Sequence, residues 1–596
     1  MIGLVAVTVA GRGAAARLAA SWPGETRCYE GPAAAALPAA WAECDGLVCF
    51  LAAGAVIRLI APLLESKQTD PAVVCVDEAA RYAVALTGGH AGGANALAAR
   101  AAAALGAEPV ITTATDAAGL PGLDMLGWPA EGAVAAVSRA LLDGEPVTLE
   151  SDQTWPLPPL PVLGSPGAGQ GTEAGPGPQA GPGKGTGADR PASPARGDSL
   201  RADAAPETGY RIVVTDRVMP VDGRTVVLRP PSLVVGAGAS RGVTAGEVLG
   251  LLDRVLAGAG LSPASVAALA TVDAKADEPG LVEAARQRGW PLITHPAGTL
   301  AAIPVPTPSQ AALAAVGTPS VAEAAAVASA AELLVPKNKS AMATIAVARV
   351  RPRGRLAVVG LGPGARDLLT PRAAAELRRA SVVVGLNQYL GQIRDLLRPG
   401  TRVLASGLGA EEGRARSAVA QARQGHAVAL VGSGDAGVYA MASPALAEAG
   451  DDIDVTVVPG VTASLAAAAL LGAPLGHDHA VISLSDLHTP WQVIECRVSA
   501  AAEAGFVTVF YNPRSRGRDW QLGAALAILA RHRPPDTPAG VVRNASRPGE
   551  QVTLTTLAGL DAAAADMLSI VVVGTAATRA VAGRMVTPRG YRWQHS

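Results

Sequence analysis

The stretch that decides the fold of the C-terminal half is Leu356–Gly364, with the sequence LAVVGLGPG. A short apolar run, typical of a buried β-strand, leads directly into a glycine-rich turn. A helix is expected from Pro371, because Thr370 suits the N-cap position and proline suits the first helical position. Glycines after a strand allow the backbone to approach a ligand closely. The stretch therefore predicts a strand, a ligand-facing turn and a helix at the start of an α/β lobe.

This turn does not match a dinucleotide-binding motif. In such a fold the helix opens directly from the glycine turn, and an acidic residue ends the next strand. Here Pro363 lies inside the turn and the helix begins late, while the next apolar run, 381–385, ends in Gly385. The pattern disfavours NAD binding.

Outward from this stretch, short Val/Leu/Ile runs alternate with Ala-rich helical stretches, as in 46–51 with 55–64 and 427–432 with 436–449. This alternation predicts an α/β, multi-domain chain with largely parallel sheets. The 596 residues, of which 49% are hydrophobic, can fill roughly three to four domains. A junction near 351–354 separates an N-terminal from a C-terminal half, and the halves show no obvious internal repeat.

One segment differs in composition from the rest of the chain. Residues 164–209 consist mainly of Gly, Pro, Ala and Ser with almost no large apolar side chain. Such a composition cannot pack a core, so we expect a disordered insert. Its GPGKGTG stretch lacks the Ser or Thr that follows lysine in a phosphate-binding loop, and no strand leads into it.

Charge and cysteine usage exclude several classes of protein. The net charge is -1, from 49 Lys+Arg and 50 Asp+Glu, without a basic stripe, which argues against nucleic acid as the main partner. The 5 cysteines form no CxxC pair, which argues against structural zinc and a disulfide scaffold and favours a reducing, cytoplasmic location. The apolar segment 47–64 contains Arg58 and Pro62, so no membrane span is expected. The first residues, MIGLVAVTVAG, favour a β-strand over a signal peptide.

Three further motifs follow in the C-terminal half. Residues 431–443 read VGSGDAGVYAMAS, residues 458–464 read VPGVTAS, and FYNP at 510–513 leads into a basic loop with Arg514, Arg516 and Arg518. Together with GLGPG, these ordered motifs resemble the tetrapyrrole (corrin/porphyrin) methylase family. Within it the likeness is to the precorrin-3B / cobalt-factor III C-17-methyltransferases, and it covers about 354–590.

This resemblance implies two α/β lobes with S-adenosylmethionine in the cleft between them, and a homodimer through this half. A sulfonium methyl group is already activated, so catalysis mainly requires positioning of the methyl donor against the macrocycle. Carried over by position, the cofactor-binding residues would be Gly362, Pro363, Gly434, Asp435, Ala436, Val438, Thr462, Ala463, Ser464, Tyr511, Asn512, Arg543 and Asn544. Asp435 could alternatively cap the following helix.

The family substrate is a polycarboxylate tetrapyrrole, for which Arg514, Arg516 and Arg518 would be bidentate anchors. In the family, C-17 methylation accompanies ring contraction and formation of a δ-lactone. Four titratable candidates for assisting that step lie nearby: His477, His479, Asp486 and His488. No metal site is visible, so any cobalt is expected to arrive with the substrate.

The N-terminal half places charged and polar groups at the ends of its predicted elements. The segments are 54–62, 67–71, 76–78, LTGGHAGGAN at 86–95 and ITTATD at 111–116. They resemble the CbiG family of cobalt-precorrin-5A hydrolases, and the likeness continues at 233–238, 270–278 and 316–325. Ala239 departs from the family pattern, which commonly has cysteine after GxG.

The CbiG resemblance implies opening of the ring-contraction δ-lactone with loss of acetaldehyde. Water attack on a lactone needs a general base and an oxyanion stabiliser. We expect His90 to be the acid/base, with Asp116 or Glu78 supporting it. Arg58 or Lys67 would hold substrate carboxylates. Lys275 and Glu278 are the catalytic candidates of the second CbiG-like domain.

Three alternatives remain open from the sequence. Gly238–Gly242 matches the GxSxG nucleophile elbow, and Asp273 and His295 follow in the usual order, although this domain is small for an α/β-hydrolase. The N-terminal half could instead be a non-catalytic corrinoid-binding partner that works beside neighbouring pathway enzymes. The methylase could act at another tetrapyrrole position. The expected domains are 1–130, a partial region 131–163, the insert 164–209, 210–350, and methylase lobes 354–461 and 462–596.

Overall fold

The computed structural model describes residues 1–66, 69–89, 93–163, 209–515 and 517–590. The segment expected to be a disordered insert, 164–209, lies outside the described residues except for Gly209. Contacts divide the chain into two units, which are described separately below. Unit 1 comprises 1–153 and 160–352, and unit 2 comprises 154–159 and 353–596.

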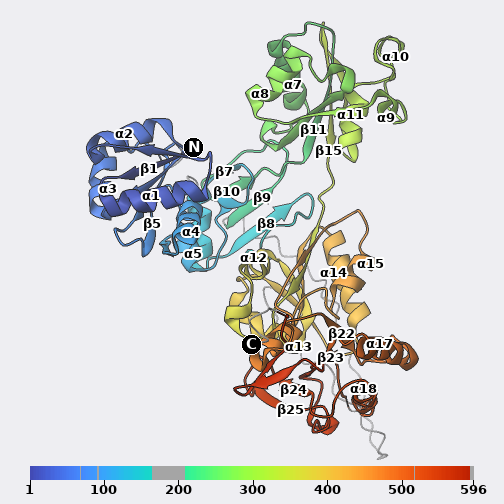
Figure 1. The fold of residues 1–596 in the computed structure, drawn as a ribbon. Coiled ribbons are helices and arrows are strands. Elements are labelled where there is room, and N and C mark those ends of the chain that lie inside the picture. Colours follow the sequence, from blue (N-terminus) through green and yellow to red (C-terminus); the bar gives the residue numbers. More distant parts are fainter. Residues whose placement is uncertain (67–68, 90–92, 164–208, 516, 591–596) are drawn as a thin grey trace, which may run out of the picture. The chain divides into compact units, whose positions relative to one another are not determined.

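Unit 1 begins with a six-stranded sheet in the order β2-β1-β3-β4-β5-β6 (Figure 1). Its strands are β1 (Ile2–Ala6), β2 (Thr26–Tyr29), β3 (Gly46–Phe50), β4 (Ala72–Val76), β5 (Tyr82–Thr87) and β6 (Glu108–Val110). Helices α1 (Val9–Ser21) and α4 (Ala94–Leu105) cover one face, and α2 (Ala33–Glu43) and α3 (Ala53–Ile60) cover the other. The expected first strand is confirmed as β1. Pairing is parallel except between β4 and β5. Strands β5 and β6 therefore run opposite to the other four strands.

The next sheet of unit 1 is formed from both sides of the Gly/Pro-rich segment. Its order is β7-β10-β9-β8, with α6 (Val134–Asp143) packed against it. The strands are β7 (Ala130–Gly132), β8 (Val147–Ser151), β9 (Tyr210–Val214) and β10 (Thr225–Leu228). We expected a separate domain to begin at residue 210. In the structure β9 instead pairs with β8, and β10 pairs with β7. The buried Arg229 also donates to Glu131 at 2.7 Å, so 210–229 belongs with 130–151.

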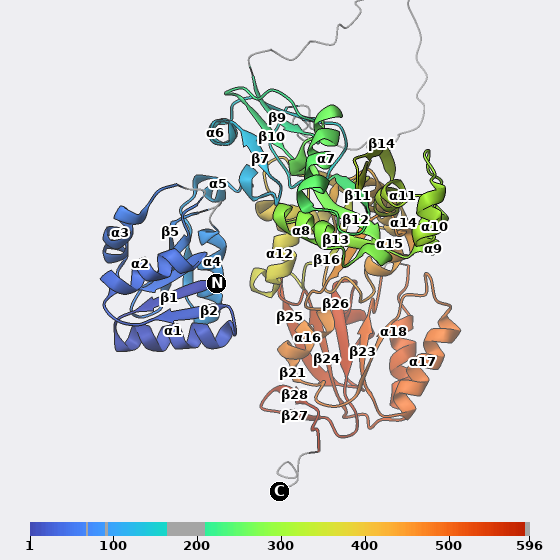
Figure 2. The ribbon, with the colours of Figure 1, turned by 90° about the horizontal axis from the view of Figure 1, so that it is seen from above.

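The last sheet of unit 1 has the order β13-β12-β11-β15-β14. Its strands are β11 (Leu233–Ala239), β12 (Val266–Val272), β13 (Leu292–His295), β14 (Glu332–Lys339) and β15 (Ala343–Arg349). Helices α7 (Ala245–Gly258) and α8 (Pro279–Arg288) cover one face, and α9 (Ala297–Ala301) and α11 (Ala322–Ser329) the other, as Figures 1 and 2 show. A Cβ at Gly236 would lie 1.8 Å from the carbonyl oxygen of Ala322, so glycine is required where α11 crosses β11.

Unit 2 starts with a five-stranded, wholly parallel sheet, which we call the first lobe. The order is β18-β17-β19-β16-β20, with β16 (Arg355–Gly360), β17 (Val382–Leu386), β18 (Arg402–Ser406), β19 (Ala427–Gly432) and β20 (Asp454–Val458). Helices α12 (Pro371–Arg379) and α13 (Asn387–Ile393) lie on one face, and α14 (Glu411–Arg423) and α15 (Ala442–Glu448) on the other. The N-cap prediction is confirmed: the Thr370 side chain accepts the Ala373 N–H. The helix expected from 436 begins only at Ala442, because 434–441 form a turn.

The second lobe of unit 2 is a mixed sheet in the order β22-β23-β26-β24-β25. Its strands are β22 (His479–Ser483), β23 (Val507–Tyr511), β24 (Pro538–Arg543), β25 (Gln551–Thr556) and β26 (Ser569–Val573). Helices α17 (Trp491–Glu503) and α18 (Gln521–Ala530) cover one face, and α16 (Ala463–Leu471) covers the other. The expectation of largely parallel sheets is wrong here. The short loop between β24 and β25 makes an antiparallel hairpin, and β26 pairs antiparallel on both sides.

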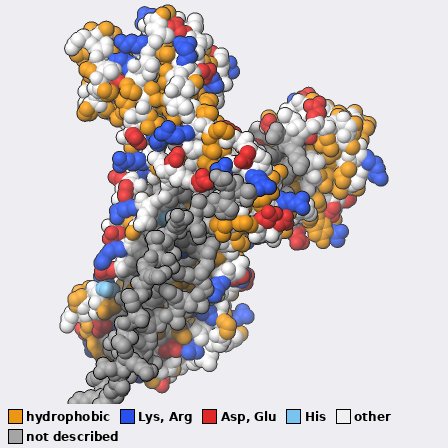
Figure 3. Space-filling model, turned by 180° about the vertical axis from the view of Figure 1, so that it is seen from behind, with side chains coloured by type: hydrophobic (Ala, Val, Ile, Leu, Met, Phe, Trp, Pro, Cys, Tyr) orange, Lys and Arg blue, Asp and Glu red, His pale blue; other side chains and the backbone are white. Residues whose placement is uncertain are grey.

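The surface carries mixed charges. In Figure 3, Lys and Arg side chains alternate with Asp and Glu over the visible described surface, in keeping with a net charge of -1. Among the described residues, the helices are too short or too polar to span a bilayer.

Candidate active sites

Three glycine-containing turns of unit 2 meet at the carboxyl ends of β16, β19 and β20. Gly362 and Gly434 exchange backbone hydrogen bonds, with N–O distances of 3.0 and 2.7 Å. A Cβ at Gly360 would lie 2.7 Å from the Gly434 oxygen and 2.9 Å from the Gly460 nitrogen. The turns are therefore packed backbone to backbone, which only glycine permits at these positions. The sequence motifs GLGPG, GSGDAG and VPGVTAS therefore pack together at this end of the sheet.

Asp435 connects two of these turns. One carboxylate oxygen accepts the Gly437 N–H at 2.8 Å and the other accepts the Gly460 N–H at 3.0 Å. The alternative that Asp435 caps the following helix is wrong, because α15 begins at Ala442, well beyond the turn. Its carboxylate instead fixes the relative position of the second and third turns.

A pocket of about 460 Å³ opens beside these turns. It is lined by Gly437, Val438, Tyr439, Thr462, Ser464, Leu465, His479 and Val481. The first three come from the turn after β19, and the last two from β22 of the second lobe. Both lobes of unit 2 thus contribute to the pocket.

Two tyrosines hold the walls of this pocket. The Tyr511 hydroxyl accepts the Ser464 N–H at 2.9 Å and shares a hydrogen bond of 2.5 Å with the Thr462 hydroxyl. The Tyr439 hydroxyl donates to the Val481 carbonyl at 3.0 Å, and burial raises the pKa of this tyrosine. The two rings lie 5.3 Å apart. Tyr439 has a φ of 49°, a left-handed conformation that a bulky residue rarely adopts.

Arg547 was not identified from the sequence, although its side chain reaches this site. From the loop between β24 and β25 it donates through Nε to the carbonyl of Pro363 and through Nη2 to the Ser433 hydroxyl at 2.6 Å. It therefore binds the first and second turns at once. Its only sequence signal is its place four residues after Arg543, one of the predicted cofactor-binding residues.

Other residues expected on the cofactor side have mainly protein partners. Arg543 forms an ion pair with Asp566 at 2.8 Å. The Asn512 side chain donates to the Ser483 hydroxyl at 3.1 Å, and Asn544 donates weakly to the Gly549 carbonyl. Gly362, Pro363, Gly434, Asp435 and Ala436 lie in the joined turns, Val438, Thr462 and Ser464 line the pocket, and Ala463 begins α16.

The arginines of the basic loop after Tyr511 differ in burial and in their hydrogen-bond partners. Arg518 is buried and donates to the Ser485 hydroxyl and the Asn512 carbonyl, both at 3.0 Å, and burial lowers its pKa. It holds the loop, so its guanidinium is largely occupied. Arg514 is partly exposed and has no ion pair or side-chain hydrogen bond within the described residues. Arg516 lies outside the described residues.

The titratable candidates near the second lobe are dispersed. His479 lines the pocket, whereas His477 accepts the N–H of Asp478 and is exposed. Asp486 accepts from Gln521 at 2.9 Å, and His488 is exposed. No group of His, Cys, Asp and Glu with metal-binding geometry occurs in the described part of the chain.

In unit 1, Asp116 belongs to a polar cluster beyond the carboxyl ends of β5 and β6. The Asn95 amide donates to Thr113 Oγ1 and to Asp116 Oδ2, both at 3.0 Å, and the Thr113 hydroxyl donates to the same Asp116 oxygen. Asn95 is 8% exposed. The cluster adjoins Gly89, whereas His90 itself and Lys67 lie outside the described residues.

Glu78 and Arg58 are not brought to this cluster. Glu78 lies in the turn after β4, while Asp116 follows β6. Because β5 runs antiparallel to β4 and parallel to β6, the two carboxylates lie at opposite edges of the sheet. Arg58 lies on α3, which starts after β3 at the same edge as Glu78, and its guanidinium bonds the Gly54 carbonyl.

The candidates of the second CbiG-like domain form an ion pair. Lys275 Nζ lies 2.9 Å from a Glu278 oxygen, and the other Glu278 oxygen accepts the Gly242 N–H at 2.7 Å. These bonds hold the pKa of Glu278 below its usual range. The serine-hydrolase alternative gains no support. His295 bonds Ser329 at 2.7 Å, and α7 begins at Ala245 rather than directly after Ser240.

The two lobes of unit 2 and the pocket lined by elements of both define a two-lobed α/β enzyme. The model of the Tetrapyrrole (Corrin/Porphyrin) Methylases matches residues 355–561. The chain belongs to the tetrapyrrole methylase family. In unit 1, models of the cobalamin synthesis G N-terminus and C-terminus match 35–116 and 233–348, so the chain also carries both CbiG domains.

Relatives of known name match the methylase part. The "Probable cobalt-factor III C(17)-methyltransferase" of Salmonella typhimurium is 46% identical over 40% of this chain and 99% of its own length. The "Precorrin-3B C(17)-methyltransferase" of a Sinorhizobium species is 43% identical over 38% of this chain and 91% of its own. Among solved structures, the methyltransferase CobJ is 38% identical, covering 39% of this chain and 100% of its own, with a TM-score of 0.38.

Proposed function

We propose that the chain catalyses two steps of corrin ring synthesis. Unit 2 would transfer a methyl group from S-adenosylmethionine to C-17 of precorrin-3B or cobalt-factor III, with ring contraction. Unit 1 would open the resulting δ-lactone and release acetaldehyde. The observation that carries the first activity is the junction of the three turns through Gly360, Gly362, Gly434 and Asp435 beside a pocket that both lobes line.

The residues at this junction fit S-adenosylmethionine. Glycine allows a ligand to approach the backbone closely, and Gly437 of the second turn lines the pocket. Val438, Thr462 and Ser464 line the pocket where the cofactor would be held, with Tyr511 fixing the latter two. When bound, S-adenosylmethionine supplies an activated sulfonium methyl group. The protein's contribution is then to orient the donor and acceptor, which can account for much of a rate enhancement without a titratable catalyst.

The substrate assignment rests on the named relatives and on charge. Both of them act, by name, at C(17) of a precorrin or a cobalt factor. Arg514, which lacks a protein partner among the described residues, is a suitable anchor for a substrate carboxylate, whereas Arg518 is already bonded. Cobalt would enter with the substrate, and the methylase half would form a homodimer.

For unit 1 we propose that Asp116, oriented by Asn95 and Thr113, supports lactone hydrolysis. A second function is that unit 1 binds the corrinoid without catalysis. Two observations favour it: Ala239 replaces the cysteine common in the family, and Glu78 and Arg58 lie far from Asp116 at the other sheet edge.

The test is mass spectrometry of the full-length chain with S-adenosylmethionine and either precorrin-3B or cobalt-factor III. Gain of one methyl group with the mass of the lactone-bearing product is expected, and the preferred substrate reveals the metal state. Absence of methyl gain on both substrates contradicts C-17 methylation and favours another ring position. Acetaldehyde is then assayed with the cobalt-precorrin-5A substrate; corrinoid binding without acetaldehyde favours the carrier function.

A further inference from the structure

Unit 1 contains a second pocket, of about 840 Å³, at the carboxyl ends of β11 and β12. Its walls come from the turn after β11, the turn after β12, the β14–β15 hairpin, and the segment from α10 (Gln310–Val316) to the start of α11. This volume falls within the range of about 300–1,000 Å³ typical of small-molecule sites. The pocket shares no lining residue with the cluster around Asp116, which lies at another sheet of unit 1.

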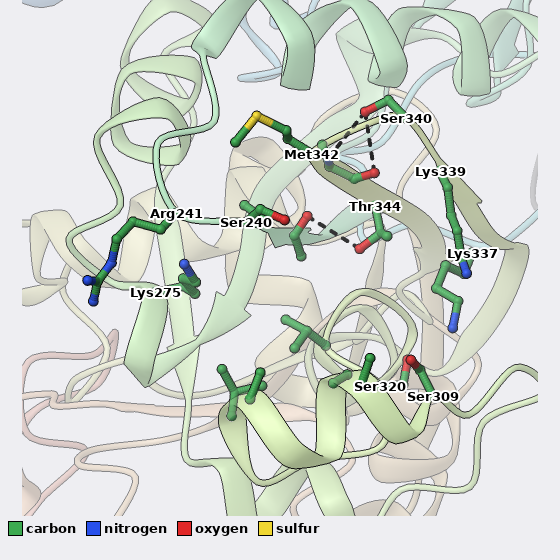
Figure 4. A pocket seen from close by; sticks show the side chains of 18 of the residues that line it. Ser240, Arg241, Lys275, Ser309, Ser320, Lys337, Lys339, Ser340, Met342 and Thr344 are labelled. Carbon is green, nitrogen blue, oxygen red and sulfur yellow. Dashed lines mark hydrogen bonds between the residues drawn. The ribbon is translucent and has the colours of Figure 1, made fainter.

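The pocket is strongly basic. Its lining includes Arg241, Lys275, Lys337 and Lys339, and none of its described lining residues is acidic. Figure 4 shows Arg241 and Lys275 at one flank and Lys337 and Lys339 at the opposite flank. Cations on opposite flanks of a cavity whose lining has no acidic residue favour an anionic ligand with negative charge at more than one place.

Two of these cations are already bound to protein groups and two are not. Lys275 pairs with Glu278, and Lys337 Nζ donates to the Thr307 carbonyl. Arg241 and Lys339 have no ion pair or side-chain hydrogen bond with any described residue. Each flank therefore has one cation without a hydrogen-bond partner among the described residues, able to form a charge-assisted hydrogen bond with a ligand.

Between the flanks, the lining is small and mostly apolar. It consists of Ala239, Ala274, Ala311, Ala312, Ala315, Val316, Val321, Ala341, Met342 and Ala343. Ser240 and Ser309 also line the pocket, and their hydroxyls form no side-chain hydrogen bond with described residues. A ligand that suits these walls has an apolar body and acidic groups on its edge.

The flanks are fixed before any ligand binds. Glu278 ties the turn after β11 to the turn after β12 through Gly242 and Lys275. On the other flank, the fully buried Glu323 accepts the backbone N–H groups of Thr307 and Lys337. A pocket held in this way pays little ordering cost on binding, which raises affinity.

We propose that this pocket is a binding site for a polycarboxylate with an apolar, ring-sized body, held by Arg241 at one end and Lys339 at the other. The inference deepens the proposed function and rests on it in one respect: the substituted macrocycle is the molecule of this chemistry that unit 2 handles. The pocket lies in unit 1, so the chain has a macrocycle site separate from the methyl-transfer pocket.

The probe is an octacarboxylate porphyrin, titrated into the full-length chain and followed by calorimetry and porphyrin fluorescence. The pocket variant is Arg241→Ala with Lys339→Ala. The matched control is Arg17→Ala with Arg254→Ala, which removes the same charge from exposed positions of α1 and α7 outside the pocket. Methyl transfer is measured on all three proteins, because it depends on unit 2 alone and reports the proposed function separately.

Porphyrin is expected to bind the wild-type and control proteins at this pocket in addition to the methyl-transfer pocket. In the pocket variant one of these sites should weaken by roughly tenfold or more, the effect of losing charge-assisted hydrogen bonds. Methyl transfer should not change. Unaltered stoichiometry and affinity in the pocket variant would overturn the proposal even if methyl transfer is normal.

Two competitors test the ligand chemistry. Propane-1,2,3-tricarboxylate should displace porphyrin from the Arg241/Lys339 site more effectively than inorganic phosphate at equal concentration. Equal or better displacement by phosphate would show a phosphate site and overturn the carboxylate assignment. A dicarboxylate porphyrin should bind this site more weakly than the octacarboxylate, and equal binding would overturn the role of cations at both flanks.

Discussion

The Arg547 guanidinium donates a 2.6 Å hydrogen bond to the Ser433 hydroxyl, joining a loop of the second lobe to the GSGDAG turn of the first. A second bond runs from the same side chain to the Pro363 carbonyl in the GLGPG turn. A single side chain thus fixes two of the three glycine-containing turns from the opposite lobe. The planar guanidinium can make both bonds at once, which a lysine ammonium on a flexible stem does poorly.

We expect Arg547→Ala to lower kcat/KM for S-adenosylmethionine by about ten- to a hundredfold, since two hydrogen bonds involving a charged group are lost. Arg547→Lys should restore only part of the loss. Steady-state methyl transfer with varied S-adenosylmethionine measures both. Arg531→Ala removes an exposed cation from the same lobe and should leave kcat/KM unchanged. Wild-type kinetics in Arg547→Ala would contradict a positioning role.

We predict that each carboxylate oxygen of Asp435 contributes separately to the affinity for S-adenosylmethionine. Asp435→Asn keeps the size of the side chain but turns one acceptor into a donor that faces the N–H of Gly437 or Gly460. Loss of one such bond costs about 1–3 kcal/mol, so the affinity for S-adenosylmethionine should fall by roughly ten- to a hundredfold. Calorimetric titration measures this affinity. Asp451→Asn, at an exposed position of the same lobe, is the control, and an equal effect of both substitutions would argue against the bridge.

Tyr511→Phe tests a structural contribution of the pocket wall. It removes the acceptor of the Ser464 N–H, a residue that is 3% exposed, and the partner of the Thr462 hydroxyl. An unsatisfied buried donor costs about 1–3 kcal/mol. We expect the free energy of unfolding in urea to fall by this amount, with weaker S-adenosylmethionine binding. Tyr389→Phe, whose hydroxyl has no hydrogen bond within the described residues, should unfold like the wild type.

Local features of the fold could be predicted because their causes lie within a few residues. The β16 strand, the Thr370 N-cap and α16 follow from hydrophobic runs, a capping hydroxyl and a helix-forming Ala/Leu stretch. The late start of α15 could not be predicted, because distant segments hold the 436–441 turn: the Asp435 carboxylate accepts the N–H groups of Gly437 and Gly460, and the Tyr439 hydroxyl donates to the Val481 carbonyl.

Relationships between distant segments required the structure. Arg547 lies 114 positions from Ser433, and no local pattern shows that the β24–β25 loop returns to the first lobe. Likewise Glu78 and Asp116 both follow strands of one sheet, and in a wholly parallel sheet they would share an edge. The reversal at β5 separates them, and the Val/Leu/Ile runs that predict the strands carry no signal of their direction.

Asp116→Asn distinguishes a catalytic from a carrier role for unit 1. If the carboxylate supports lactone hydrolysis, acetaldehyde release should fall by about 10²–10⁴-fold, the usual contribution of a positioned acid or base. Methyl transfer by unit 2 should be unchanged in the same sample. Asp124→Asn, an exposed carboxylate of the same region, should retain acetaldehyde release. Equal acetaldehyde release from Asp116→Asn and the wild type would remove Asp116 from the reaction.

Glu278 should act through stability at low pH rather than as a general acid. The Lys275 ammonium and the Gly242 N–H hold the pKa of Glu278 below the ordinary value of about 4.3. The folded state therefore favours the ionised form, and its stabilisation is present above the unfolded-state pKa and lost as the pH falls through the folded-state pKa. A carboxyl group with such a pKa is ionised at neutral pH and has no proton to donate there.

Glu278→Gln should consequently lower the free energy of unfolding at pH 7, and the difference from the wild type should shrink from about pH 5 downward. Urea unfolding at a series of pH values measures the difference, and hydrogen exchange of the Gly242 amide reports the site itself. Asp277→Asn is the control, because Asp277 is exposed next to Glu278 and has no ion pair or side-chain hydrogen bond with a described residue. A difference that stays constant from pH 7 to pH 3 would contradict the linkage, and a loss of acetaldehyde release without any loss of stability would return Glu278 to the catalytic candidates.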